Sequence, residues 1–249
     1  MESKVVLITG GSRGIGAQSA ILAAKQGWDV VITYRNQPIE AQKIVDYILE
    51  LGCYAIAIKM DLAIEQEIID LFEKIDSEFG RLDALINNAG VITAISKFTD
   101  MSSDRIKNVF NINVVGTFIC TQQAVKRMVI SEEGRGGSIV NLSSVAATIG
   151  SPNEFIDYAA SKGAIDTLTL GLAKEVAEDG IRVNAVRPGL INTEMHGDAG
   201  DINRPEKLKH NIPMRRAGEP CEVASAVIWL ISDEASYVNG AILDVSGGR

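Results

Sequence analysis

Short runs of branched apolar residues alternate along the chain with longer segments of helical periodicity, and this alternation constrains the fold more than any other feature. The runs are nearly continuous in Val, Ile and Leu, which is typical of strands buried on both faces of a parallel sheet. Strands are predicted over residues 4–9, 29–34, 54–59, 82–87, 137–142, 181–186 and 241–245. Helices are predicted over residues 14–26, 38–51, 64–79, 103–131, 157–179 and 219–232. The pattern predicts an α/β fold with right-handed crossovers and a doubly wound sheet, with helices on both faces.

The length of the chain and the lack of a recognisable linker favour a single domain over residues 1–249. The chain has 249 residues and contains no linker, low-complexity segment or solenoid-length repeat. A chain of this size can bury roughly 75% of its unfolded surface around a single core. Residues 188–218 form the least regular stretch, and a long segment of that kind is typically a functional lid or disordered.

Charge and composition limit the partners of the chain. Lys and Arg total 24 against 32 acidic residues, a net charge of −8, and no basic stripe is present, which argues against a nucleic-acid partner. No apolar run approaches the roughly 20 residues that span a bilayer. The run Val5–Ile8 is too short for a signal peptide and has no small-residue cleavage site after it. Cys53, Cys120 and Cys221 are too widely spaced for a disulfide framework or a metal site, and are interpreted as ordinary buried thiols. A cytoplasmic protein without metal or membrane attachment is predicted.

A glycine-rich turn connects the first predicted strand to the first predicted helix. Free N–H groups and the positive end of a helix dipole favour a pyrophosphate at such a place, and missing side chains let the backbone approach it. The glycines stand at 10, 14 and 16, a spacing that differs from the common Gly-x-Gly-x-x-Gly fingerprint. They could also serve the turn alone. The candidate cofactor residues of this segment are Gly10, Ser12, Arg13, Gly14, Ile15 and Gly16.

The end of the second predicted strand bears on the choice of nucleotide. Dinucleotide folds use this position to bind the adenosine ribose, and an acid there accepts from the 2′-hydroxyl of NAD. Here the strand ends with Tyr34 and Arg35, without an acid. Arg35 and Arg13 could pair with a 2′-phosphate, so a preference for NADP(H) is predicted, with NAD(H) possible. The alternative is that Arg35 is a solvated surface arginine.

Tyr158 and Lys162 are four residues apart in a strongly helical segment and therefore share one helix face. A positive charge about 4 Å from a phenol is worth roughly 4 kcal/mol at an effective dielectric near 20, which is about three pKa units. Lys162 is therefore expected to lower the pKa of Tyr158 into the range of acid/base catalysis. Ser144, just past the strand at 137–142, could hold a substrate oxygen; the alternative is a serine that caps a turn.

Taken together, these motifs resemble the short-chain dehydrogenase/reductase family over the whole chain, in particular its glucose dehydrogenase-like and 3-oxoacyl-carrier-protein reductase-like branches. Five features match in order: the glycine turn, Asp61-Leu62, Asn87-Asn88-Ala89-Gly90, Ser144 with Tyr158 and Lys162, and Arg187-Pro188-Gly189. The resemblance implies a Rossmann-type sheet of seven mostly parallel strands. It also implies hydride transfer between a nicotinamide ring and a small carbonyl compound or secondary alcohol.

The resemblance carries roles over to matching positions. Tyr158 would exchange the proton of the substrate oxygen, Lys162 would lower its pKa and hold the nicotinamide ribose, and Ser144 would orient the substrate. Asn113 would position a water beside the lysine, with Asn111 as a nearby competitor. The further implied cofactor contacts are Tyr34, Arg35, Asp61, Leu62, Asn87, Ala89, Gly90, Tyr158, Lys162, Pro188, Gly189, Ile191 and Thr193. The family also implies a homotetramer formed through residues 103–131, 157–179 and the C-terminal region.

The substrate remains open at this point. By analogy with the family, residues 190–215 would close over it as a lid. His196 in that segment is either a substrate contact or a solvated loop histidine, while Asn153 and Phe155 are candidates for the pocket wall. A sugar would be expected to meet several polar side chains, and an acyl carrier protein a basic patch that the sequence does not locate. A sugar dehydrogenase using NAD(P) and a non-catalytic NADP-binding sensor or scaffold are the alternative functions.

Overall fold

The computed structural model describes residues 3–130 and 134–249, and its centre is a seven-stranded sheet. The strand order is β3-β2-β1-β4-β5-β6-β7, and every neighbouring pair is parallel. The strands are β1 (Val5–Ile8), β2 (Asp29–Tyr34), β3 (Ala55–Lys59), β4 (Ala84–Asn87), β5 (Gly137–Leu142), β6 (Ile181–Pro188) and β7 (Ile242–Val245). The predicted fold class is confirmed, and each strand lies where the sequence pattern places it.

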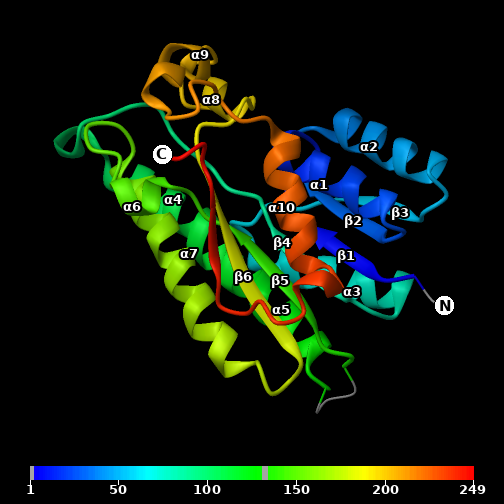
Figure 1. Cartoon of the computed structure of the whole chain (residues 1–249). Helices are drawn as coiled ribbons and strands as arrows, with labels where there is room; N and C mark the ends of the chain where they lie inside the picture. Colours follow the sequence, from blue (N-terminus) through cyan, green and yellow to red (C-terminus); the bar gives the residue numbers. More distant parts are fainter. Residues whose placement is uncertain (1–2, 131–133) are drawn as a thin grey trace.

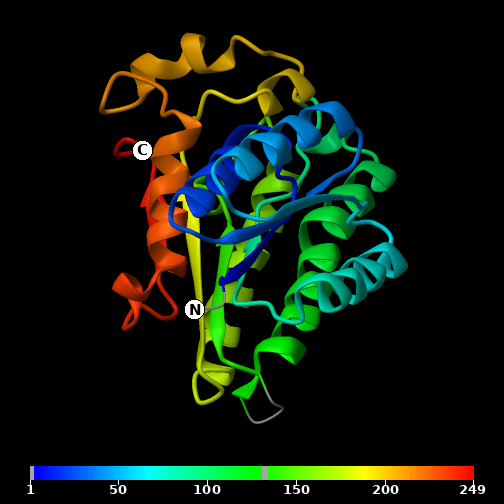
Figure 2. The ribbon, with the colours of Figure 1, turned by 90° about the vertical axis from the view of Figure 1, so that its right-hand side faces the viewer.

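Helices cover both faces of the sheet (Figures 1 and 2). One face packs against α1 (Gly14–Lys25), α2 (Pro38–Glu50) and α10 (Pro220–Ile231). The other packs against α3 (Glu65–Phe79), α5 (Thr117–Met128) and α7 (Ile156–Glu175). Because both faces are buried, the strands need apolar residues at every position rather than at alternate ones, which explains the continuous Val, Ile and Leu runs.

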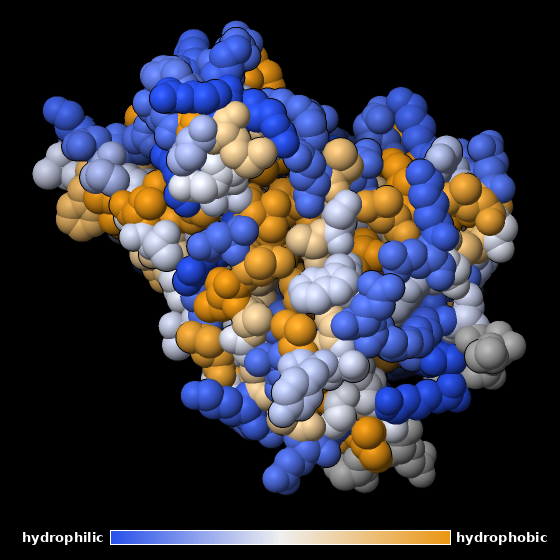
Figure 3. All heavy atoms as spheres, viewed as in Figure 1, coloured by the Kyte–Doolittle hydropathy of each residue, from blue (hydrophilic) through white to orange (hydrophobic). Residues whose placement is uncertain are grey.

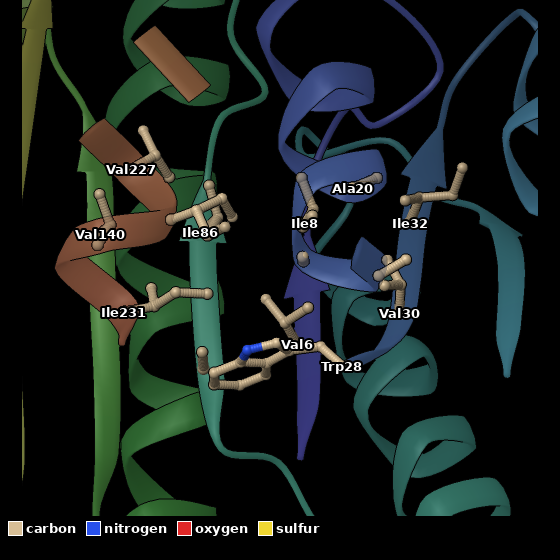
Figure 4. Close-up of a cluster of buried hydrophobic side chains, with 14 of the residues drawn as sticks. Val6, Ile8, Ala20, Trp28, Val30, Ile32, Ile86, Val140, Val227 and Ile231 are labelled. Carbon is tan, nitrogen blue, oxygen red and sulfur yellow. The ribbon is translucent and has the colours of Figure 1, made fainter. Parts of the chain in front are cut away.

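Alternation along each strand divides the core into two layers. Val6 and Ile8 of β1 belong to the cluster shared with α1 and α10, whereas Val5 and Leu7 belong to the cluster shared with α3 and α5. Figure 4 shows the first cluster, in which Trp28 lies close to Val6 across the face of the sheet. The sheet is therefore a rigid platform whose carboxyl edge can hold a site in a fixed geometry.

The long helix predicted over 103–131 is divided into three parts. Between α4 (Ser103–Phe110) and α5 lies a π-helical segment, η2 (Asn111–Gly116), which contains Asn113. Such π segments are rare and are frequently found at functional sites. Gly116 permits a close approach, because a Cβ there would lie 2.4 Å from the Leu62 carbonyl oxygen. The predicted end of this helix, Ser131, lies outside the described residues.

The segment 190–215 is folded into short helices at one end of the molecule (Figures 1 and 2). They are α8 (Met195–Asp198), α9 (Arg204–Leu208) and the 3₁₀ turn η4 (Lys209–Asn211). The remaining short elements are α6 (Ala146–Ile149), η1 (Phe98–Asp100) and η5 (Asp233–Ala235). We refer to residues 190–215 as the lid segment.

The cysteines are less uniform than the sequence suggested. Cys120 is buried, Cys53 is partly buried and Cys221 is exposed, and all three are free thiols. The expectation of three buried thiols is therefore wrong for Cys221, which lies in the first turn of α10, and only partly right for Cys53. Across the described ranges, no helix combines the length and the apolar character needed to cross a membrane.

Candidate active site

The strand order changes direction between β1 and β4, which places a crevice at the carboxyl edge of these two strands. The glycine turn follows β1, and Asn88 follows β4. The Asn88 side chain clamps the turn, since its Nδ2 donates to the carbonyl oxygens of Thr9 and Gly10, both at 2.9 Å. Sequence reasoning passed over Asn88, although it lies within the Asn87-Asn88-Ala89-Gly90 motif that it used.

The glycines of the turn are required by close backbone packing. A Cβ on Gly16 would lie 2.3 Å from the Gly10 carbonyl oxygen, and Gly10 itself has a φ of +66°. Arg13 is the N-cap of α1 but makes no side-chain cap, and the first turn carries no acid. The first N–H groups of α1 are therefore uncapped at the edge of the crevice, and the positive end of the helix dipole lies at the same place. This bare cradle fits the pyrophosphate of a dinucleotide.

The residues predicted to contact the adenosine end lie around the ends of β2 and β3. Tyr34 is partly buried, and Arg35 is exposed, with its Nη1 4.0 Å from Asp61 Oδ2. Leu62 is only 6% exposed, and its side chain packs in the core. Ser12 donates to Gln37 Oε1 at 3.3 Å.

Two further predicted contacts have protein partners already. Arg13 Nη2 forms an ion pair at 2.5 Å with Asp198 Oδ2 of the lid segment. Asn87 is buried, and its Nδ2 donates to Thr121 Oγ1 and Asn141 Oδ1. The Asn87 side chain therefore joins β4 to its neighbours beneath the turn, while Asn88 is the asparagine that lines the pocket.

Three of the four predicted catalytic residues, Ser144, Tyr158 and Lys162, line a single pocket, whereas Asn113 is not among its lining residues. Ser144 follows β5, whereas Tyr158 and Lys162 lie on the first turns of α7. The pocket reaches the cofactor segments as well, because it is also lined by Ile15, Gly90, Pro188, Gly189, Ile191 and Thr193. Gly14 adjoins it, since a Cβ there would lie 3.5 Å from the Thr193 methyl group.

Lys162 is buried with one strong hydrogen bond. Its Nζ donates to the Leu142 carbonyl oxygen at 2.6 Å and lies 5.6 Å from the centroid of the Tyr158 ring. Burial lowers the pKa of Lys162 to about 8, and the negative charge of Asp166, one helical turn further along α7, partly opposes this.

The pKa of Tyr158 differs from the expectation. Burial raises it to about 12, and a hydrogen bond with Ser144 only partly opposes the rise. The expected lowering by Lys162 is wrong for this structure, because desolvation of the phenolate outweighs the other contributions. The Lys162 ammonium is directed to the Leu142 carbonyl rather than to the phenol oxygen.

The structure distinguishes the two serines after β5. Ser143 Oγ donates to the Lys162 carbonyl oxygen at 3.2 Å and so ties the strand end to α7. Ser144 instead hydrogen-bonds Tyr158, and its Oγ accepts from the Ala146 N–H at 3.1 Å. Ser144 is therefore the hydroxyl that stands beside the phenol.

Asn113 and Lys162 both lie close to Gly90. A Cβ on Gly90 would be 3.2 Å from Asn113 Oδ1 and 3.6 Å from Lys162 Nζ. The Asn113 side chain also binds the Val91 backbone in both directions, accepting at 2.8 Å and donating at 2.9 Å. The competitor Asn111 is exposed and contacts the Ala63 carbonyl oxygen, so Asn113 is the asparagine at the site.

Sequence reasoning also missed a buried ion pair beside Tyr158. Asp157 accepts from Arg105 Nε at 2.7 Å and from Arg105 Nη2 at 3.1 Å, which joins α4 to the start of α7. The only sequence signal was an acid in the first turn of a helix, which is ordinary. Among the described residues, no group of His, Cys, Asp or Glu side chains is arranged to hold a metal ion.

Three features assign the protein to the class of Rossmann-type oxidoreductases. They are the parallel sheet, the glycine turn, and the Ser, Tyr and Lys side chains that share one pocket. Comparison with known proteins narrows this class. The family model described as Enoyl-(Acyl carrier protein) reductase matches residues 10–249. The chain belongs to the short-chain dehydrogenase/reductase family of NAD(P)-dependent oxidoreductases.

Individual relatives cover nearly the whole chain. The uncharacterized oxidoreductase YgfF of Escherichia coli (strain K12) is 47% identical over 98% of this chain and 99% of its own. The L-rhamnose 1-dehydrogenase (NAD(P)(+)) of Sphingomonas sp. (strain SKA58) is 39% identical over 100% and 96%. The crystal structure of a short chain dehydrogenase from Burkholderia cenocepacia J2315 in complex with NADP is 36% identical, with a TM-score of 0.90 over 98% and 97%.

Proposed function

We propose that the protein is an NADP(H)-preferring oxidoreductase that transfers hydride between nicotinamide and a small carbonyl compound or secondary alcohol. The observation that carries this proposal is the single pocket lined by Ser144, Tyr158 and Lys162 beside the glycine turn. A sensor or scaffold would need the cradle but would have no use for the three polar side chains together.

Tyr158, Ser144 and Lys162 each have a separate role in the transfer of the proton. Nicotinamide, when bound, supplies the hydride for reduction of a carbonyl and accepts it in the reverse direction. With a pKa of about 12, Tyr158 is protonated at neutral pH and is ready to donate its proton to the carbonyl oxygen. Ser144 holds that oxygen, and the Lys162 ammonium stabilises the phenolate that remains. Asn113 keeps the segment beside Lys162 in place through the Val91 backbone.

A Tyr158→Phe variant tests the proposal. Loss of the proton donor should lower kcat by about 10²- to 10⁴-fold, while NADPH binding measured by fluorescence titration stays close to wild type. Tyr237→Phe is the matched control, because Tyr237 is fully exposed at 102% of its reference surface. Substrates come from a panel of sugars, ketones, quinones and acyl thioesters. NADPH binding with no turnover of the panel, or equal turnover by wild type and Tyr158→Phe, would contradict the proposal.

The preference for NADP(H) is supported by charge at the end of β2. No acid stands at positions 34–36, and Arg35 is exposed, so its guanidinium could exchange the long 4.0 Å contact with Asp61 for a phosphate. We expect Arg35→Ala to lower the ratio of kcat/KM for NADPH to that for NADH by about tenfold, as expected when a charge-assisted contact is lost. Lys25→Ala, at the far end of α1, controls for net charge. An unchanged ratio in Arg35→Ala would remove this part of the proposal.

The family analogy also supports a homotetramer. Residues of the two predicted interface helices expose apolar side chains, including Val115, Phe118 and Leu170, and the edge strand β7 exposes Leu243. Figure 3 shows apolar side chains gathered in the middle of one face of the molecule, below the hydrophilic lid segment. Burial of such patches between subunits is favourable. Multi-angle light scattering should give four times the monomer mass, and a monomer would refute the assembly.

A further inference from the structure

The pocket has a second group of polar side chains that the proposed hydride and proton chemistry does not use. Glu154, His196 and Arg204 line it together with Ser144 and Tyr158. Arg204 begins α9 and His196 lies in α8, so both belong to the lid segment, while Glu154 precedes α7. We call these three residues the polar wall.

An ion pair joins the two sides of the polar wall. Arg204 Nη2 donates to Glu154 Oε2 at 2.6 Å, and the Arg204 side chain is only 12% exposed. The guanidinium also lies over the ring of Phe155, 5.2 Å from its centroid. Within the described part of the chain, Arg204 donates no other side-chain hydrogen bond. Glu154 Oε1 and several Arg204 N–H groups therefore keep hydrogen-bonding capacity at the pocket.

His196 contributes a hydrogen-bond acceptor. Its Nε2 lies 2.8 Å from the Ile191 carbonyl oxygen, which can only accept, so Nε2 carries the proton. Burial lowers the pKa of His196 below its usual value, which keeps the ring neutral at pH 7. The other ring nitrogen, Nδ1, is then an acceptor, and no described side chain donates to it.

The loop that carries Glu154 is held in an unusual backbone conformation. Ser151, which also lines the pocket, has a φ of +44°, and Asn153 has a φ of +61°. Non-glycine residues in this region cost free energy and persist where the surrounding structure enforces them, often at binding sites. The surrounding structure therefore fixes the loop that presents Glu154 to the pocket.

On the basis of the function proposed above, we propose that the substrate is a small polyhydroxylated carbonyl compound of the sugar type, or the corresponding polyol, whose hydroxyl groups bind Glu154, His196 and Arg204. A hydroxyl is both donor and acceptor, so one class of group serves the carboxylate, the imidazole Nδ1 and the guanidinium alike. Val145, Ile149 and Phe155 line the same pocket and offer apolar contact to the C–H face of such a molecule.

An acyl chain matches the polar wall poorly. Packed against these three side chains, it would remove their remaining polar atoms from water without replacing the lost hydrogen bonds, which is unfavourable. A site that hydrogen-bonds substrate hydroxyls discriminates strongly against analogues that lack them, because its own buried groups are then left unpaired. Removal of hydroxyls from the substrate should therefore weaken catalysis more than shortening of its carbon chain.

The test compares aldoses with their deoxy analogues, simple ketones and an acyl thioester, using wild type, His196→Phe and Glu154→Gln. In wild type we expect kcat/KM for the best aldose to exceed that for the simple ketones by at least tenfold. His196→Phe should lower kcat/KM for the aldose about tenfold more than it lowers kcat/KM for the simple ketones, the difference expected for one substrate hydrogen bond. His210→Phe is the matched control, since His210 is exposed in the same segment and does not line the pocket.

Two measurements separate this inference from the function on which it rests. Calorimetric titration of an aldose into Tyr158→Phe with NADP⁺ reports binding without turnover. If the aldose binds and His196→Phe weakens that binding about tenfold, the polar wall is supported even when no turnover is found, and only the proposed reaction fails. The inference is overturned if ketones or the thioester are the better substrates, or if His196→Phe affects all substrates equally.

Discussion

The cofactor end and the substrate end of the pocket are built in different ways. At the glycine turn the groups that are bound belong to the backbone: the Gly11 N–H donates to the Thr33 carbonyl oxygen at 2.9 Å, and the Asn88 side chain donates to two further backbone carbonyls. At the lid segment the contacts are made largely by side chains, as in the Arg204 pair with Glu154. Few substitutions fit into the closely packed glycine turn. Side chains of the lid segment, in contrast, can be replaced one by one without changing Ser144, Tyr158 or Lys162.

The two ends meet where the glycine turn faces residues 193–198 of the lid segment. Arg13 of the glycine turn pairs with Asp198 of the lid segment, and Thr193 lies against Gly14. Both Arg13 and Asp198 are exposed, and exposed pairs of this kind contribute little to stability. The lid segment is therefore anchored to the cofactor end by weak contacts, while the glycine turn is anchored to the sheet by strong ones.

The largest expected difference between the two ends concerns glycine. Gly16→Ala would place a Cβ 2.3 Å from the Gly10 carbonyl oxygen, so the turn must shift and NADPH affinity should fall by at least tenfold. Gly197→Ala is the matched change in the lid segment, where a Cβ would meet only Ile202 at 3.5 Å. We expect it to leave NADPH affinity unchanged. Fluorescence titration and thermal unfolding of both variants measure the contrast.

Equal losses of NADPH affinity in the two glycine variants would show that the lid segment is as closely packed as the turn. If Gly16→Ala bound NADPH like wild type, the proposed role of the glycine turn in holding the cofactor would be contradicted. Normal circular dichroism spectra in both variants would exclude global unfolding as the cause.

A smaller effect is expected from pH, through Lys162 at the cofactor end. Its pKa of about 8 lies below the usual value, so the ammonium is present below that pH and is lost as pH rises through it. Since Tyr158 has a pKa of about 12, it stays protonated over the same range. We therefore expect kcat/KM for carbonyl reduction to fall about tenfold per pH unit above pH 8.

Lys162→Arg sharpens this prediction, because a guanidinium keeps its charge at every pH of the assay. Even if the variant is slower overall, its profile should lose the descending limb near pH 8. A limb that stays in place in Lys162→Arg would assign the titration to another group. The His196→Phe profile provides the corresponding measurement for the lid segment, and it should keep the descending limb near pH 8 because Lys162 is intact.

The same contrast explains what could be predicted from the sequence. The strands were predictable because burial on both faces leaves an unbroken apolar pattern. Helical spacing placed Tyr158 and Lys162 on one helix face, but their choice as a catalytic set with Ser144 came from the family resemblance. In the polar wall, His196 was a candidate from the sequence, but the Glu154–Arg204 pair was not predictable. Glu154 and Arg204 are 50 residues apart, and only the path of the lid segment brings them together. The raised pKa of Tyr158 depends on burial, which spacing along a helix does not report.

The smallest expected effect concerns stability. On the sheet side, Arg187 Nη2 of β6 binds Asp166 Oδ2 of α7 at 2.8 Å, with the two side chains 19% and 10% exposed. Asp166→Asn removes the negative charge of this pair, leaves Asp244, 3.7 Å away, as the remaining carboxylate beside Arg187, and should lower the free energy of unfolding by about 1–3 kcal/mol. Lys207→Ala breaks an exposed lid pair with Asp201 and should leave Tm unchanged. If urea unfolding ranked these two variants in the opposite order, the lid segment would be the more firmly held of the two regions.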